Sequence, residues 1–83
     1  MRVSGQIDED LDNKFNELLS IFEKKNCRKI SLYLNSYGGQ LFYGVKIGET
    51  VRKKNIETFM TDNCDSACGY IFIGGIKKKY KKI

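Results

Sequence analysis

Residues 29–39, KISLYLNSYGG, decide the fold that we predict for this chain. In the first half of this stretch every second position is apolar, the period of a β-strand that buries one face. These apolar positions are Ile30, Leu32 and Leu34. The strand then meets Gly38 and Gly39, and glycine lets a backbone turn sharply without steric cost. We therefore expect a strand, a tight turn and then a helix.

Strand and helix patterns alternate on both sides of this turn. Before it, apolar residues recur with helical spacing from Asp8 onward: Leu11, Phe15, Leu18, Leu19 and Phe22. After it we expect a second helix, one face of which carries Leu41, Val45, Gly48 and Val51. A further strand over 56–62 and a third, apolar and therefore buried helix over 66–75 complete the pattern. This alternation predicts an α/β domain with a parallel sheet and right-handed crossovers.

Two of the predicted strands end in segments that could form a site. Ligands of parallel α/β sheets bind beyond the carboxyl ends of the strands. The two ends here are NSYGG, residues 35–39, and DNCDSA, residues 62–67. If neighbouring strands carry them, the Gly38–Gly39 turn and Ser66 share one edge of the sheet.

Charge and composition exclude several classes of protein. The net charge is +5, and residues 77–83, KKKYKKI, carry five lysines. We favour a solvated segment over a nucleic-acid contact, because no nucleic-acid module accompanies these lysines. Three cysteines without a histidine are too few for a zinc site, so we expect no metal and no cofactor. No apolar run of about 18 residues and no secretory signal is present, which predicts a cytoplasmic protein without membrane contact.

Both candidate turns allow two interpretations. Glycines at a helix start can simply relieve steric strain, or they can expose backbone N–H groups that bind an anion. Ser66 can cap the third helix, since serine is strongly preferred at that position. Alternatively, Ser66 is a nucleophile at a helix N-terminus, where the dipole stabilises negative charge.

The motifs also resemble a known family. ISLYLNSYGG, then a helix, then IETFMTDNCDSACGYIFIGG is similar to the Clp protease proteolytic subunits, within the wider Clp/crotonase fold. That family has Asn-Ser-Pro-Gly-Gly after the strand, and Tyr37 takes the place of the proline here. The resemblance covers residues 1–83 as a single partial domain with an incomplete C-terminal half. It also implies that GGIKKKY begins the next strand of the family fold.

The resemblance implies a serine peptidase and assigns roles to individual residues. Ser66 matches the nucleophile, and the backbone N–H groups of Gly39 and Ala67 match the two halves of the oxyanion hole. Gly38 shapes the same turn. Two further positions match residues that hold the turn rather than react, Asn35 and Ser36. The family cleaves peptides and proteins, assembles into rings and receives substrates from a partner AAA+ ATPase, which implies a homo-oligomer and such a partner here.

Two departures from the family pattern matter. The family's base is a histidine downstream of the serine, oriented by an aspartate, but this chain has no histidine and ends 17 residues after Ser66. A serine without a base is a poor nucleophile, so we expect the chain alone to be weakly active or inactive. A related peptidase branch uses a lysine base, and Lys46 is the nearest candidate, although it lies at no matching motif position.

The second departure is the pair of cysteines around the serine. Cys64 and Cys68 can pack as small apolar residues, or they can form a disulfide if their Cα atoms lie within about 7 Å. Two other functions also stay open on the same fold. One is a non-catalytic module for self-assembly or binding, and the other is a crotonase-like acyl-thioester enzyme.

Overall fold

The computed structural model describes residues 1–27, 29–75 and the backbone of 78–80. Four strands are present: β1 (Arg2–Ser4), β2 (Ser31–Ser36), β3 (Glu57–Cys64) and β4 (Lys78–Tyr80). Three helices alternate with them: α1 (Glu9–Lys24), α2 (Leu41–Lys53) and α3 (Ala67–Gly74). Part of the lysine-rich segment therefore forms a strand, and the rest of that segment lies outside the described residues.

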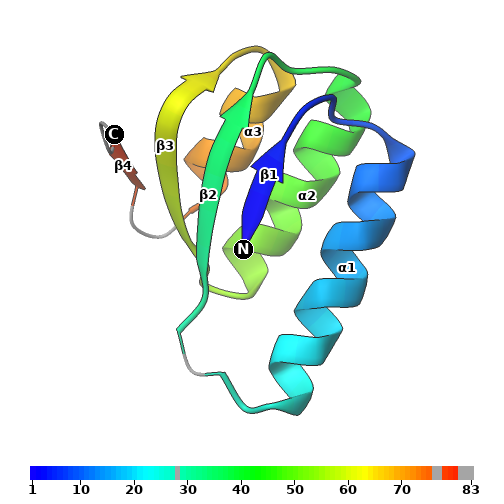
Figure 1. Cartoon of the computed structure of the whole chain (residues 1–83), viewed down its shortest axis with the longest axis vertical. Helices are drawn as coiled ribbons and strands as arrows, with labels where there is room; N and C mark the ends of the chain where they lie inside the picture. Colours follow the sequence, from blue (N-terminus) through cyan, green and yellow to red (C-terminus); the bar gives the residue numbers. More distant parts are fainter. Residues whose placement is uncertain (28, 76–77, 81–83) are drawn as a thin grey trace.

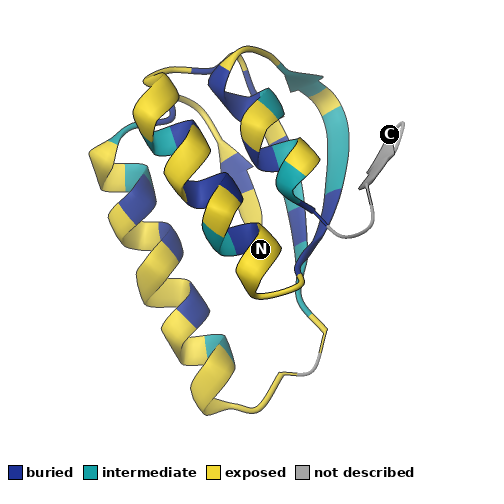
Figure 2. Ribbon diagram, turned by 180° about the vertical axis from the view of Figure 1, so that it is seen from behind, coloured by how far each residue is buried: buried dark blue, intermediate teal, exposed yellow. Residues whose placement is uncertain are grey.

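All four strands run parallel and stand in the order of the chain, β1-β2-β3-β4. Each crossover between neighbouring strands carries one helix, and α1, α2 and α3 cover the same face of the sheet (Figures 1 and 2). The predicted α/β fold with a parallel sheet and alternating helices is confirmed.

The core lies between the sheet and this helical layer. Val3 of β1 and Leu32 and Leu34 of β2 point toward the helices and are almost fully buried. The helices contribute Phe15, Leu19, Ile47, Val51 and Ile71. In Figure 2 the buried positions form stripes along helices that are otherwise exposed, as expected for a two-layer domain.

The second helix buries only part of the predicted face. Leu41 and Val45 are exposed, whereas Gly44 is buried together with Ile47, Gly48 and Val51. The reason is the close approach of α2 and α3: a Cβ on Gly44 would lie 2.5 Å from the carbonyl oxygen of Ala67. The glycines therefore select the buried face, and they fix the start of α3 against α2.

Candidate functional site

The carboxyl ends of β2 and β3 lie next to each other, at the upper edge of the sheet in Figure 1. Ser36 at the end of β2 is in register with Cys64 at the end of β3. Directly beyond this pair, the Asp65 N–H donates to the Ser36 carbonyl over 3.0 Å. The two turns predicted to form a site therefore follow neighbouring strands and lie side by side.

An irregularity in the pairing shapes this edge. Leu34 is in register with Met60, but Ser36 is in register with Cys64, so β3 contains two more residues than β2 over the same length. Thr61 in the extra segment donates through Oγ1 to the Leu34 carbonyl over 3.3 Å. Bulges of this kind bend a strand and re-aim the residues that follow it.

The glycine turn is held tightly by the segment after β1. Ile7 N–H donates to the Gly38 carbonyl over 3.0 Å, and Gln40 N–H donates to the Ile7 carbonyl over 2.8 Å. Gly39 lies between these bonds with φ of 152°, and a Cβ there would be 2.6 Å from Ile7 N. The intervening N–H, that of Gly39, donates to no acceptor among the residues that the structure describes.

Ser36 holds the same turn from beneath. Its side chain is buried, and its Oγ accepts from the Gly38 N–H at 3.0 Å. The same hydroxyl donates to the Gly5 carbonyl at 2.5 Å. One buried side chain thus ties the loop after β1 to the turn after β2, which fixes the direction in which the Gly39 N–H points.

Ser66 stands directly before α3 in an unusual backbone conformation, with φ of 51° and ψ of −117°. Its residue is exposed, and its hydroxyl does not make the capping hydrogen bond to the helix. Ser66 therefore occupies the capping position without acting as a cap. A non-glycine residue in such a region costs about 1–3 kcal/mol, and serines on sharp strand-to-helix turns of this kind present their Oγ outward.

The two turns touch each other at Gly38. A Cβ at that position, where φ is 109°, would lie 3.0 Å from Ser66 Cβ and 3.5 Å from Ala67 N. Ala67 is fully buried, and its N–H, the first of α3, has no acceptor within the described part of the chain. The structure therefore brings together Gly38, Gly39, Ser66 and Ala67.

A disulfide joins the two cysteines that flank the serine. Cys64 and Cys68 are bonded, with their Cα atoms 4.9 Å apart. Cys64 is partly exposed at the end of β3, whereas Cys68 is completely buried in the first turn of α3. Of the two arrangements that the sequence left open, the structure has the bridge.

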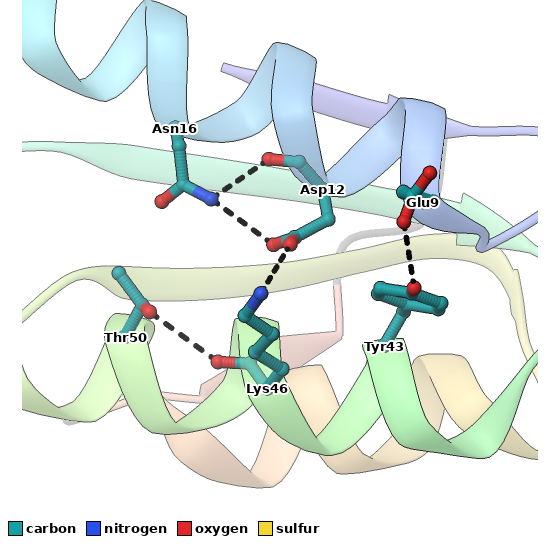
Figure 3. Close-up of polar contacts among 6 residues, drawn as sticks. All are labelled: Glu9, Asp12, Asn16, Tyr43, Lys46 and Thr50. Carbon is teal, nitrogen blue, oxygen red and sulfur yellow. Dashed lines mark hydrogen bonds and ion pairs between the residues drawn. The ribbon is translucent and has the colours of Figure 1, made fainter.

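Lys46 lies in a different place from the candidate site. Its Nζ forms an ion pair with Asp12 Oδ2 over 3.1 Å, between α1 and α2 (Figure 3). The Asp12 carboxylate is buried and also accepts from Asn16 Nδ2 over 3.1 Å. Because α2 turns Lys46 toward α1 and Gly44 toward Ala67, Lys46 does not supply a base for Ser66 in this arrangement.

A second polar contact extends this junction between α1 and α2. The Tyr43 hydroxyl donates to Glu9 Oε2 over 3.1 Å (Figure 3), and this bond to a carboxylate raises the pKa of Tyr43.

Among the residues that the structure describes, no three histidine, cysteine, aspartate or glutamate side chains gather as a metal site.

Large apolar side chains next to the glycine turn were missed by the sequence reasoning. Tyr37 is 79% exposed and Phe42 is 68% exposed, and Leu41, the first residue of α2, is also exposed. The signal that could have predicted this exposure is Tyr37, which stands in the place of the family's proline. An aromatic side chain directly before a glycine turn has no strand partner, so Tyr37 could have been expected to be exposed.

Comparisons with known proteins agree with this fold. The sequence model of a family described as Clp protease matches residues 1–82. A solved structure of a mutant of the 1510-N membrane-bound stomatin-specific protease superposes with a TM-score of 0.75 at 22% identity. The match covers 89% of this chain but only 38% of that one, so the chain spans less than half of that protein. Within the described part of this chain, no helix has the length and apolarity needed to cross a bilayer.

Proposed function

Because this chain belongs to the Clp protease family, we propose that it is a serine peptidase domain with Ser66 as its nucleophile. The observation that carries the proposal is the backbone of Ser66, an exposed residue that is held in a strained conformation and whose hydroxyl is not used for capping. A structural cap would relax this strain, whereas a nucleophile needs a free hydroxyl that faces the substrate.

The two free N–H groups beside Ser66 support an oxyanion hole. When Ser66 Oγ attacks a peptide carbonyl, the carbonyl oxygen becomes negatively charged and requires donors that are already in place. Gly39 N–H and Ala67 N–H would supply them, and Ser36 and Gly38 keep the glycine turn in position. Removing one such donor typically costs about 10²–10³ in kcat.

Proton transfer limits what these 83 residues can do alone. The Oγ proton must pass to a base, and the same group must later protonate the leaving amine. The sequence has no histidine, and Lys46 is paired with Asp12. We therefore propose that the chain by itself is weakly active or inactive toward peptides, and that the base comes from outside these 83 residues.

The same proposal includes the family's partners. Peptides or unfolded proteins are the substrates, the chain assembles with copies of itself, and an AAA+ ATPase feeds the assembly. No cofactor takes part in these steps, because the nucleophile and both oxyanion donors are supplied by the chain.

Covalent labelling tests this assignment without requiring turnover. A fluorophosphonate probe reacts with a serine that is exposed and activated by nearby donors, so we expect slow modification at Ser66, located by peptide mass spectrometry. Ser66→Ala should abolish it. Ser20→Ala, which removes an exposed serine of α1, should not change it. Absence of modification at Ser66, or equal modification of Ser66→Ala, would show that Ser66 is not the nucleophile.

A non-catalytic assembly or binding module on the same fold is the second candidate. It is favoured by the exposed apolar side chains around the site, namely Tyr37, Leu41 and Phe42. Sedimentation at rising concentration distinguishes it. Self-association that Phe42→Ser weakens, in a chain that the probe does not label, would favour this module over the peptidase.

A further inference from the structure

We infer that the Cys64–Cys68 disulfide is a site of thiol–disulfide exchange with dithiols, and that its redox state sets the conformation of Ser66. In the oxidised form the bridge keeps the Ser66 hydroxyl free; after reduction the turn relaxes and the hydroxyl caps α3. The link to catalysis rests on the proposed function, but the conformational change does not.

The position of the bridge is the first argument. It joins the last residue of β3 to the second residue of α3, and Ser66 stands midway between the two cysteines. The other non-glycine residues with positive φ, among those that the structure describes, are Asn26 and Asn55. Both are asparagines just beyond helix ends, where that residue tolerates positive φ. Serine is not a residue type that tolerates positive φ well, so the surroundings of Ser66 must impose the conformation.

Apart from the bridge, the serine turn is held by hydrogen bonds of its backbone. Asp65 N–H donates to the Ser36 carbonyl and Cys68 N–H donates to the Asp65 carbonyl, both over 3.0 Å, and Gly69 N–H donates to the Ser66 carbonyl over 2.9 Å. The side chain of Ser66 itself makes no hydrogen bond within the described residues. The disulfide is therefore the covalent restraint that spans the strained residue.

The short span of the bridge concentrates its effect on this turn. A disulfide stabilises a whole fold more when it closes a longer loop. This one links residues only four positions apart and joins no distant elements. Its removal should therefore change the serine turn far more than the global fold.

Exposure determines how exchange proceeds. A dithiol's thiolate attacks Sγ of the partly exposed Cys64, the S–S bond breaks, and Cys68 leaves as a thiolate that takes up a proton. The reagent's second thiol then attacks its own sulfur in the mixed disulfide and releases Cys64 as a thiol. The dithiol loses two electrons and becomes a cyclic disulfide. The buried Cys68 thiol stays packed, since a free cysteine behaves as a small apolar residue.

The two interpretations of Ser66, helix cap and nucleophile, then belong to the reduced and the oxidised form of the turn. With negative φ, the hydroxyl reaches the N–H groups of the first turn of α3 and caps the helix, as serine normally does. In the cytosol, where thiols are kept reduced, disulfides are usually transient or redox-sensing. A bridge that frees a nucleophile when oxidised fits that behaviour.

Nuclear magnetic resonance of the ¹⁵N-labelled chain tests the conformational part. A Cys27→Ser background removes the remaining, exposed cysteine, so that only the pair reacts. Dithiothreitol should add two hydrogens to the mass and shift the amide resonances of residues 65–69 and of Gly38, while those of α1 stay in place. A chain that has no bridge under non-reducing conditions, or a Ser66 resonance that does not move on full reduction, would overturn the inference.

Probe labelling in both redox states tests the functional part. The rate of fluorophosphonate modification at Ser66 should fall at least tenfold on reduction and return on reoxidation. The variant Cys64→Ala/Cys68→Ala should label at the reduced rate with or without dithiothreitol; if it does not fold, the reversible comparison on the parent chain still decides. Equal labelling in both states would overturn control of the nucleophile. Shifted resonances without labelling in either state would contradict the proposed function and leave the conformational switch supported.

Discussion

The glycine turn after β2 and the serine turn after β3 lie at one edge of the sheet but are held in different ways. The glycine turn is fixed by hydrogen bonds to Ile7 and Ser36 and has no room for a side chain. The serine turn carries a free hydroxyl on a strained backbone and is closed by a disulfide. The first is therefore built into the fold, whereas the second can be released without unfolding it.

The largest effect should come from a side chain in the glycine turn. In Gly39→Ala the new Cβ would lie 2.6 Å from Ile7 N, at a φ that L-residues rarely adopt. Strain and overpacking together should lower the free energy of unfolding by about 3–5 kcal/mol. Urea denaturation measures this loss.

Gly5→Ala is the matched control for that substitution. Gly5 also has positive φ, but a Cβ there would meet nothing within 4 Å. It should cost about 1 kcal/mol from backbone strain alone. Equal losses in the two variants would mean that the contact with Ile7 does not hold the glycine turn.

Removing the Ser36 hydroxyl should have the next largest effect. In Ser36→Ala the buried Gly38 N–H loses its acceptor, and the link to the Gly5 carbonyl is lost as well. An unsatisfied buried donor costs about 1–3 kcal/mol, so we expect a loss of about 2 kcal/mol in urea denaturation. Labelling of Ser66 should also slow, because the Gly39 donor is no longer fixed. Normal stability together with normal labelling would contradict the role of Ser36.

The same comparison explains what the sequence could and could not predict. The shared edge of the two turns followed from the alternation of strands and helices, since carboxyl ends of parallel strands meet at one edge. The conformation of Ser66 could not be predicted from this alternation, because it depends on the bulge in β3, the contact with Gly38 and the bridge. Exposure of Leu41 was missed because tertiary contact of two glycines outweighed the apolar pattern of the helix.

Opening the disulfide should cost less than Gly39→Ala and no more than Ser36→Ala. For a five-residue loop, chain entropy predicts a loss of about 2 kcal/mol in the variant Cys64→Ala/Cys68→Ala. The parent chain with Cys27→Ser, oxidised and then reduced, is the control in the same urea titration. A loss as large as that of Gly39→Ala would mean that the serine turn is part of the global fold and not a releasable element.

The smallest effect should come from the polar contacts between α1 and α2, which neither turn touches. Lys46→Met keeps the apolar stem but leaves the buried Asp12 carboxylate with Asn16 as its side-chain partner. Lys46 is half exposed, which lowers the cost, but the Asp12 side chain is only 4% exposed, so we expect a loss of about 1–2 kcal/mol. The exposed pair of Lys54 and Glu23 gives the matched control, because Lys54→Met should cost a few tenths of that. Labelling of Ser66 should be unchanged in both variants, because Lys46 faces α1 while Gly44, on another face of α2, contacts Ala67. If Lys46→Met alone abolished labelling, Lys46 would have to leave Asp12 and act on the serine turn, and the separation of the two regions would be wrong.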